Sequence, residues 1–249
     1  MQSIKSKLRE FKLSGIYNNL EERLSYAQAQ SLSYHDFLEL LLEDELNNRK
    51  DNGYKKRYAK AKFPSYKTVE DFDFNYQPSI DKRLFNDVLS CQFVKEKRNV
   101  VFIGNPGTGK THLSTAIGIR AVAKGFKVFF TSVSEMIYSL HASKADNSYY
   151  KKLETYMAPD LLILDELGFK KLPSFSADDF FEVIAKRYEK GSLVITTNKQ
   201  FEQWSDIFAD NIMANAILDR VVHHSTVFNI NGQSYRTKNI KSHKEVSSI

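Results

Sequence analysis

The stretch Gly104-Asn105-Pro106-Gly107-Thr108-Gly109-Lys110-Thr111 decides how this chain is interpreted. It fits the phosphate-binding loop pattern G-x-x-x-x-G-K-[ST] at every position. The apolar run at residues 99–103 predicts a buried strand before the loop, and residues 112–124 predict a helix after it. A chance glycine-rich turn is the alternative, but such a turn would rarely combine the complete pattern with this strand and helix context.

The chemistry predicted for this loop is the binding of a nucleoside triphosphate with Mg²⁺. Glycines allow successive backbone N–H groups to turn toward phosphate oxygens at the positive end of the following helix. Lys110 supplies a mobile positive charge for the β- and γ-phosphates, and the Thr111 hydroxyl is a candidate Mg²⁺ ligand. The residues expected to bind the nucleotide are Gly104, Asn105, Pro106, Gly107, Thr108, Gly109, Lys110, Thr111 and His112.

A second apolar run, at residues 160–166, ends in the acidic pair Asp165 and Glu166. It predicts a strand whose carboxylates lie beside the metal of the bound nucleotide. Asp165 is expected to hold Mg²⁺ through its water shell, and Glu166 to orient and polarise the attacking water. An acidic pair after a strand is common by chance, but it is uncommon at this separation from a complete phosphate loop.

Residues 192–198 predict a further strand that ends in Asn198. If this strand lies between the other two, Asn198 can position the water or sense hydrolysis, while a turn-capping role is the alternative. The sequence from Asn198 to Phe201 resembles the start of a guanine-reading N-K-x-D element, but Phe201 stands where an Asp would bind the base. The nucleotide predicted is therefore ATP.

Arg220 lies near the end of a helix predicted at residues 211–222. From there it is a candidate for an arginine that reaches the phosphates of a neighbouring subunit and stabilises the charge of the transition state. An ion pair within the chain is the alternative, and Arg187 is a competing candidate. His223 and His224 resemble half a metal site, but no third ligand follows at a useful spacing, so a packing or capping role is favoured.

The composition limits the cellular compartment in which the protein is expected and the kind of partner that it is expected to bind. Cys91 is the one cysteine among 249 residues, so an internal disulfide is excluded. No apolar run approaches the ~20 residues of a membrane span, and the N-terminus lacks the apolar core of a secretory signal. We therefore expect a cytoplasmic protein without a membrane partner. The formal net charge of +6 suits a polyanionic partner, although charge alone is a weak indication.

The chain divides into three predicted parts: an N-terminal helical domain with a basic linker at 1–63, an ATPase domain at 64–240 and a flexible tail at 241–249. The basic run from Arg49 to Lys62 carries interleaved tyrosines, so it is either a contact surface for DNA phosphates or a solvated helix face. Two helices are predicted within 132–157, with a break at 144–148, and a closing hairpin or last strand within 226–236.

Six stretches give these features a family resemblance. Together they resemble AAA+ ATPases of the helicase-loader branch, and more closely the IstB-type ATPases that assist the transposases of bacterial insertion sequences. The stretches that carry the resemblance are Ala61–Pro64, Gly104–Leu113, Leu161–Gly168, Arg187–Glu189, Ala216–Arg220 with His223 and His224, and Gly232–Arg236.

The resemblance implies an α/β fold, namely an AAA+ P-loop NTPase with a five-stranded parallel sheet flanked by helices, plus a small N-terminal all-helical domain. It assigns Asn198 as the sensor and Arg220 as the arginine finger. It also gives Asp165 the metal and Glu166 the attacking water, as proposed above. Lys110, Asp165 and Asn198 are then expected to converge from three adjacent strand ends. Little sequence follows the last strand, so the lid of many AAA+ proteins is not expected, and Arg236 is only a weak substitute for a second sensor arginine.

The resemblance also implies partners. It predicts an ATP-dependent homo-oligomeric ring or spiral that grips and remodels duplex DNA and recruits and stimulates a cognate transposase. The alternative is a replicative helicase loader that acts on single-stranded DNA.

Overall fold

The computed structural model of the chain describes residues 2–170, 172–173, 176–208 and 210–237. The tail predicted at 241–249 lies outside these residues. By contacts the chain forms two compact units, residues 1–56 and 57–249, and helix α3 (Tyr34–Ala61) runs through the boundary. Residues 57–63, which the sequence placed with the N-terminal part, group with the larger unit.

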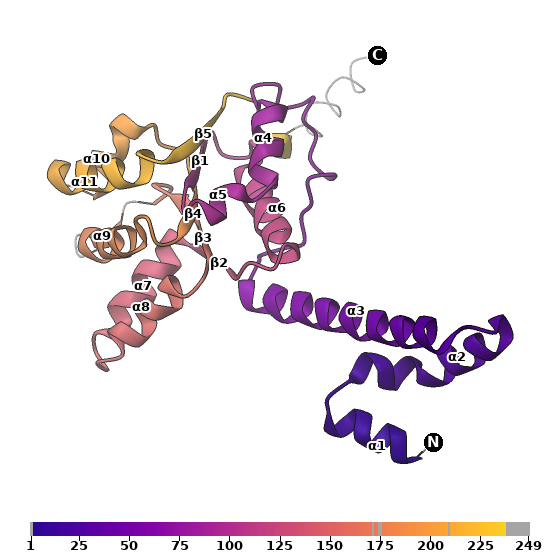
Figure 1. Cartoon of the computed structure of the whole chain (residues 1–249). Coiled ribbons are helices and arrows are strands. Elements are labelled where there is room, and N and C mark those ends of the chain that lie inside the picture. Colours follow the sequence, from indigo (N-terminus) through magenta and orange to yellow (C-terminus); the bar gives the residue numbers. More distant parts are fainter. Residues whose placement is uncertain (1, 171, 174–175, 209, 238–249) are drawn as a thin grey trace. The chain divides into compact units, whose positions relative to one another are not determined.

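The larger unit is built on a parallel sheet of five strands in the order β2-β3-β4-β1-β5 (Figure 1). Every residue of β1 and β4 is buried, as expected for inner strands of a parallel sheet that is covered on both faces. The predicted five-stranded parallel sheet is confirmed. Its strands are β1 (Asn99–Gly104), β2 (Val128–Ser132), β3 (Leu161–Leu167), β4 (Ser192–Thr197) and β5 (Ser225–Ile230).

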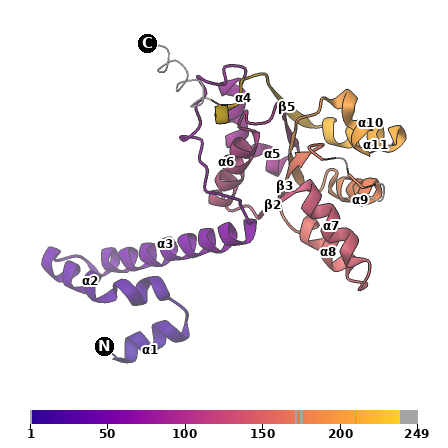
Figure 2. The ribbon, with the colours of Figure 1, turned by 180° about the vertical axis from the view of Figure 1, so that it is seen from behind.

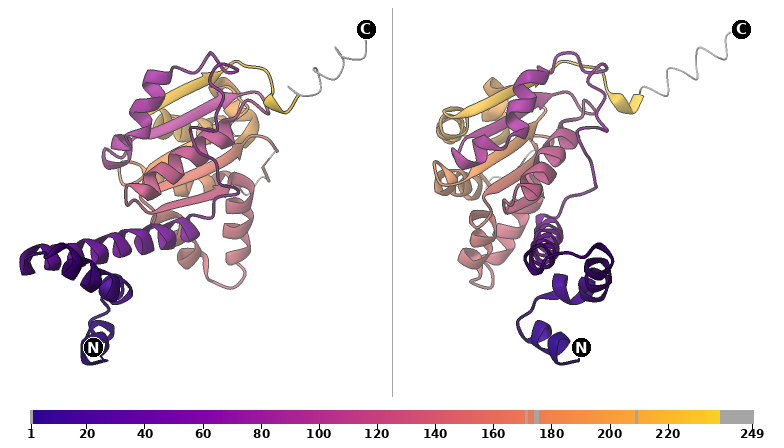
Figure 3. Two further views of the ribbon diagram at one scale, coloured as in Figure 1. Left: turned by 90° about the vertical axis from the view of Figure 1, so that its right-hand side faces the viewer. Right: turned by 45° about the vertical axis from the view of Figure 1, so that its right-hand side comes forward.

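Helices cover both faces of this sheet, with α4, α5 and α6 on one side and α7 to α11 on the other (Figures 1 and 2). Figure 3 (left) looks onto the face that α4 and α6 cover. The helices are α4 (Lys82–Leu89), α5 (Gln92–Lys95), α6 (Lys110–Ala123), α7 (Val133–Ser143), α8 (Tyr149–Met157), α9 (Ser176–Arg187), α10 (Trp204–Phe208) and α11 (Asn211–Val222), with 3₁₀ turns η1 (Phe201–Gln203) and η2 (Tyr235–Thr237).

Local sequence explains where several of these helices begin and end. Helix α6 ends before Gly125, whose φ of +98° is the left-handed conformation that glycine adopts without strain. The Ser132 side chain accepts a hydrogen bond from the N–H of Glu135 at 3.1 Å and so caps α7. Helices α7 and α8 are the two helices that the sequence predicted within 132–157, and they lie between β2 and β3 in the chain.

For residues 226–236 the sequence predicted either a closing hairpin or a last strand of the sheet. Strand β5 pairs in parallel with β1 along its whole length, from Asn99 opposite Ser225 to Gly104 opposite Ile230. Within the described residues, no antiparallel strand follows it, so the hairpin is wrong and the last strand is confirmed. The reason is that the chain after Ile230 is held by the phosphate loop, since the Tyr235 N–H donates to the Gly107 carbonyl at 2.9 Å.

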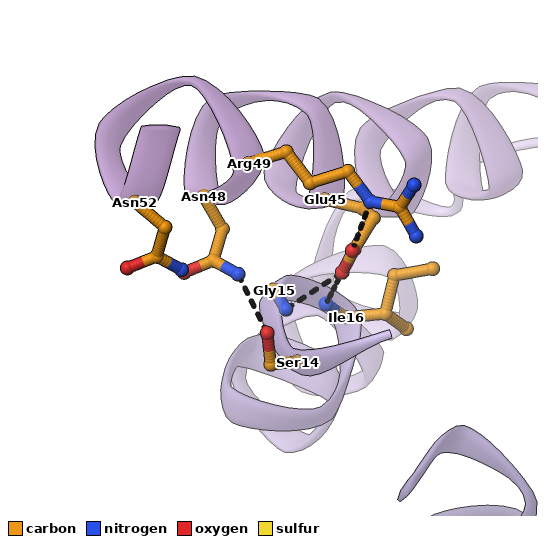
Figure 4. Close-up of polar contacts among 7 residues, drawn as sticks. All are labelled: Ser14, Gly15, Ile16, Glu45, Asn48, Arg49 and Asn52. Atoms are coloured by element: carbon orange, nitrogen blue, oxygen red, sulfur yellow. Dashed lines mark hydrogen bonds and ion pairs between the residues drawn. The ribbon is translucent and has the colours of Figure 1, made fainter. Parts of the chain in front are cut away.

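The smaller unit consists of α1 (Gln2–Glu10), α2 (Ser14–Gln30) and the first part of α3. Its core centres on Ile16, Leu20 and Leu41. The α2 N-terminus is capped from α3, because the buried Glu45 carboxylate accepts from the Gly15 N–H at 2.7 Å and pairs with Arg49 at 2.7 Å (Figure 4).

Gly15 is required at this crossing because a Cβ there would lie 2.6 Å from the Asp44 carbonyl oxygen. A capping-box-like contact lies at the start of α3, since Ser33 Oγ accepts from the Asp36 N–H at 3.2 Å and donates to its carboxylate at 2.6 Å. The basic run from Arg49 to Lys62 is helical up to Ala61, where α3 ends. No helix in the described ranges has the length and apolar character that crossing a membrane requires.

Candidate nucleotide-binding site

The phosphate loop connects β1 to α6, as its sequence predicted. Gly107 and Gly109 have φ values of +81° and +95°, which glycine adopts and which other residues avoid. A Cβ on Gly109 would also lie 2.5 Å from the Phe72 ring. The backbone turn therefore needs glycine at both positions, and Gly109 is also needed for the close approach of Phe72.

Lys110 begins α6 and is half-buried. Its Nζ donates to the carbonyl oxygens of Gly104 and Asn105, at 2.8 Å each. Burial lowers the pKa of Lys110, and the nearby Asp165 carboxylate opposes this shift. The ammonium group therefore lies in a partly desolvated position, where an additional anion would be strongly attracted.

Asp165 meets Thr111 and Thr196 at the carboxyl edge of the sheet. The Thr111 hydroxyl lies 3.0 Å from both carboxylate oxygens, and the Thr196 hydroxyl also donates to Asp165. Asp165 is only 6% exposed, and within the described part of the chain it forms no ion pair with a lysine or arginine. A buried carboxylate beside a hydroxyl is a donor set that suits Mg²⁺, so Thr111 and Asp165 fit the predicted metal.

Glu166 differs from its neighbour in backbone and exposure. It adopts a φ of +64°, at the place where the register of β3 against β4 shifts between Leu164 and Leu167. The Glu166 N–H donates to Thr196 Oγ1 at 3.0 Å, while its side chain is exposed. A left-handed backbone at a non-glycine residue costs of order 1 kcal/mol, and here it separates an exposed carboxylate from the buried one.

Asn198 follows β4, which does lie between β1 and β3. The structure nevertheless places Asn198 in a cavity of about 690 Å³ that also includes Lys170 and Lys199, and not in the one lined by Lys110. Its Oδ1 atom is buried without a hydrogen-bond partner among the described residues. The strand arrangement that the sensor role requires is present, and the role itself remains a prediction.

The cavity at the phosphate loop measures about 280 Å³. Two segments outside the loop contribute to it, one before β1, which the sequence did not assign to the site, and one after β5, where the sequence considered only Arg236. His112, predicted as a nucleotide contact, also lines the cavity, and its Nε2 lies 2.7 Å from the Thr68 carbonyl oxygen. The lining residues are Ser65, Lys67, Gly107, Gly109, Lys110, Thr111, His112, Thr115, Tyr235 and Arg236.

Comparison with known proteins decides the family. The model of the IstB-like ATP binding protein family matches residues 6–243 of the chain. The chain belongs to this family. The ATP-binding protein of insertion sequence IS5376 from Geobacillus stearothermophilus is 39% identical over 220 residues, which cover 88% of each chain. That of insertion sequence IS21 from Pseudomonas aeruginosa is 38% identical over 238 residues, covering 96% of this chain and 90% of the relative.

Solved structures place the fold of this IstB-like protein among AAA+ P-loop proteins. The DnaC helicase loader aligns with a TM-score of 0.53 at 22% identity, covering 70% of this chain and 99% of that one. DnaA from Aquifex aeolicus, bound to AMPPCP, aligns with a TM-score of 0.55 at 21% identity, covering 74% and 56%. Both the family resemblance and the fold class that the sequence predicted are confirmed.

Arg220, the predicted arginine finger of this IstB-like protein, lies outside the phosphate-loop cavity. It is partly exposed on α11, where its Nη1 donates to the Ala216 carbonyl at 2.8 Å and its guanidinium lies 5.0 Å from the Phe181 ring centroid. These contacts leave the predicted action on a neighbouring subunit untested. His223, beyond the same helix, lies 2.9 Å from the Tyr188 hydroxyl through its Nδ1.

The competing candidate, Arg187, is a core residue. Its side chain is 1% exposed, and burial lowers its pKa to about 10. A Cβ on Gly191 would lie 2.4 Å from its Nη2, so the guanidinium is tightly enclosed. A side chain held in this way cannot extend to a second subunit. Its hydrogen-bond acceptors are the carbonyl oxygens of Tyr156, Met157, Pro159, Asp160 and Ser192.

We therefore expect Arg187→Ala to act on stability. Loss of the guanidinium leaves several carbonyl oxygens unpaired and a void, so the free energy of unfolding should fall by about 3 kcal/mol. Denaturant unfolding followed by the fluorescence of Trp204, the one tryptophan and a buried residue, measures this. Lys186→Ala, on the exposed side of the same helix, should change stability by less than about 0.5 kcal/mol. Wild-type stability with lost activity in Arg187→Ala would contradict the structural role.

Proposed function

We propose that this IstB-like protein hydrolyses ATP and that its ATP-bound form assembles on duplex DNA, remodels it, and recruits and stimulates the transposase of its insertion sequence. The observation that carries the proposal is the meeting of Thr111, Asp165 and Thr196 beside Lys110 at the carboxyl edge of the sheet. Ligands of open parallel sheets bind at this edge, and phosphates bind at the N-terminus of the helix that follows the loop.

The residues of the site divide the chemistry among them. Lys110 and the backbone N–H groups of the loop hold the phosphates, and Thr111 and Asp165 supply oxygen ligands for Mg²⁺. Bound Mg²⁺ would neutralise charge on the phosphate oxygens. The exposed Glu166 carboxylate takes the part of the base that orients the attacking water. Arg220 would add positive charge to the active site of an adjacent protomer.

The proposed partners follow from the relatives. The names of the two relatives above place them in insertion sequences, and both align over nearly the whole of this chain. The likeness to DnaC is one of fold, at 22% identity. Helicase loading on single-stranded DNA is therefore the alternative, and a preference for single strands over duplex DNA would favour it.

The first test separates nucleotide binding from hydrolysis. Lys110→Ala should abolish ATP binding, whereas Glu166→Gln should bind ATP normally and lose about 10²- to 10⁴-fold in turnover. A fluorescent ATP analogue measures binding, and phosphate release measures turnover. Glu202→Gln, an exposed glutamate outside the cavity, serves as the control. Full turnover in Glu166→Gln would show that Glu166 is not the base that orients the attacking water.

The second test asks whether Arg220 acts between subunits. Arg220→Ala alone should keep ATP binding and lose turnover by about 10³-fold or more, by analogy with the arginine fingers of GTPases. Mixing it with Glu166→Gln should restore part of the turnover, because each Arg220→Ala protomer keeps its own Glu166 and can receive Arg220 from a neighbour. Two inactive variants that stay inactive together at assembly concentrations would contradict action between subunits.

The third test concerns DNA binding by the basic part of α3. Lys55, Lys56 and Lys60 are exposed, whereas Arg57 Nε already donates to the Val122 carbonyl at 3.2 Å. If the lysines bind phosphates, replacing all three with alanine should flatten the slope of log affinity against log salt by about 0.9 for each phosphate that is no longer bound. The measurement is duplex binding across a salt series.

The matched control for this test removes the same charge from other exposed positions, Lys82, Lys95 and Lys190. An equal change of slope in the two triple variants would mean that the slope depends only on the net charge of the protein. This part of α3 would then be a solvated helix face and not a contact surface for DNA phosphates.

A further inference from the structure

Helices α9 and α11 lie on the same face of the sheet and pack against each other (Figure 1). Ile184 of α9 and both Ile217 and Val221 of α11 belong to one buried apolar cluster, so the two helices share a fixed core. Arg220 precedes Val221 in the chain and is partly exposed. It therefore lies at the rim of the contact between the two helices, where it meets Phe181 of α9.

The Phe181 ring offers its face to the guanidinium of Arg220. The Cζ atom of Arg220 lies 5.0 Å from the ring centroid, a distance at which the negative face of an aromatic ring attracts a cation. Phe181 is half-buried and packs against the apolar cluster, so its ring is a firm surface. An arginine that stacks on a ring still has the N–H groups in the plane of its guanidinium for hydrogen bonds.

A hydrogen bond restrains the same guanidinium at one of its nitrogens. Nη1 of Arg220 donates to the Ala216 carbonyl at 2.8 Å, one turn earlier on α11. Among the described residues Arg220 makes no other hydrogen bond and no ion pair, so the ion pair that the sequence left open is not found there. The charge of Arg220 is therefore not neutralised, and the remaining N–H groups can bind a phosphate.

The acidic residue that adjoins Phe181 in the chain has other partners. The Glu182 carboxylate accepts from the Tyr149 hydroxyl at 2.6 Å and lies 3.6 Å from Lys186 Nζ. This matters because a carboxylate beside Arg220 would compete with phosphate for the guanidinium. An aromatic ring restrains a guanidinium without cancelling the charge that a phosphate requires.

We propose that Phe181 is a positioning residue for Arg220, and that its ring holds the guanidinium ready to act on ATP bound by the adjacent protomer. The inference rests on the function proposed above for Arg220. Phe181 acts through Arg220 and not on the nucleotide itself. The advantage is entropic, because a long side chain that is already restrained loses less conformational freedom when the subunits assemble.

The test measures phosphate release by the full chain with duplex DNA, across ATP and protein concentrations. Phe181→Leu keeps an apolar side chain and removes the ring. It should lower maximal turnover about two- to fivefold, the change expected for one cation–π contact, and leave the KM for ATP unchanged. Phe181→Tyr should restore turnover, because it keeps the ring. In an Arg220→Ala chain, adding Phe181→Leu should cause no further loss, because the contact is already gone.

Phe129→Leu is the matched control. Phe129 is also half-buried and packs against the same apolar cluster, but it belongs to β2 and not to the contact between α9 and α11. Its replacement should leave turnover unchanged. An equal loss in Phe129→Leu and Phe181→Leu would overturn the proposal, because it would assign both losses to core packing.

Three further results would also overturn the proposal. Wild-type turnover in Phe181→Leu would show that the ring is dispensable, and faster turnover would show that it holds Arg220 back. An additional loss on adding Phe181→Leu to Arg220→Ala would show that Phe181 acts by another route. Full turnover in Arg220→Ala alone would instead remove the function proposed for Arg220, and this inference with it, without affecting the nucleotide site.

Discussion

The Asp165 carboxylate is the point at which three elements of the sheet edge are joined. Through hydroxyl groups it contacts Thr111, at the start of α6, and Thr196, near the end of β4. A buried carboxylate is costly unless it is hydrogen-bonded or paired with a cation. The two hydroxyls satisfy part of that need, and the remaining negative charge is what suits the site to a metal ion. The geometry of the phosphate loop relative to β3 depends on this arrangement.

Backbone proximity is the second constraint on the site. Gly107, Gly109 and Gly232 each lie where a Cβ would collide with a residue far away in the sequence, namely Ser234, Phe72 and Gln77. The phosphate loop therefore packs against a segment that precedes β1 and a segment that follows β5, and these two segments also contact each other. Changes in either outer segment would reach the nucleotide without altering any residue of the loop itself.

The two arginines considered as a finger illustrate how burial separates roles that sequence leaves open. Arg187 is enclosed by carbonyl oxygens in the core, where its charge is stabilised by dipoles at the cost of desolvation. Among the described residues, Arg220 contacts the Ala216 carbonyl and the Phe181 ring, and it stays partly exposed. Only a side chain of the second kind has the freedom to act on another molecule.

By itself, the sequence determined the strands around the site and its centre, because these depend on local patterns: an apolar strand, the loop from Gly104 to Thr111, and an apolar strand that ends in the acidic pair Asp165 and Glu166. Only the tertiary structure decided that Thr196 binds Asp165, that Asn198 lines a separate cavity, and that Arg236 lies beside Lys110. Those outcomes depend on contacts between segments far apart in the chain. Periodicity and motif spacing describe neighbours along the sequence, whereas the meeting of distant segments is set by strand order and packing.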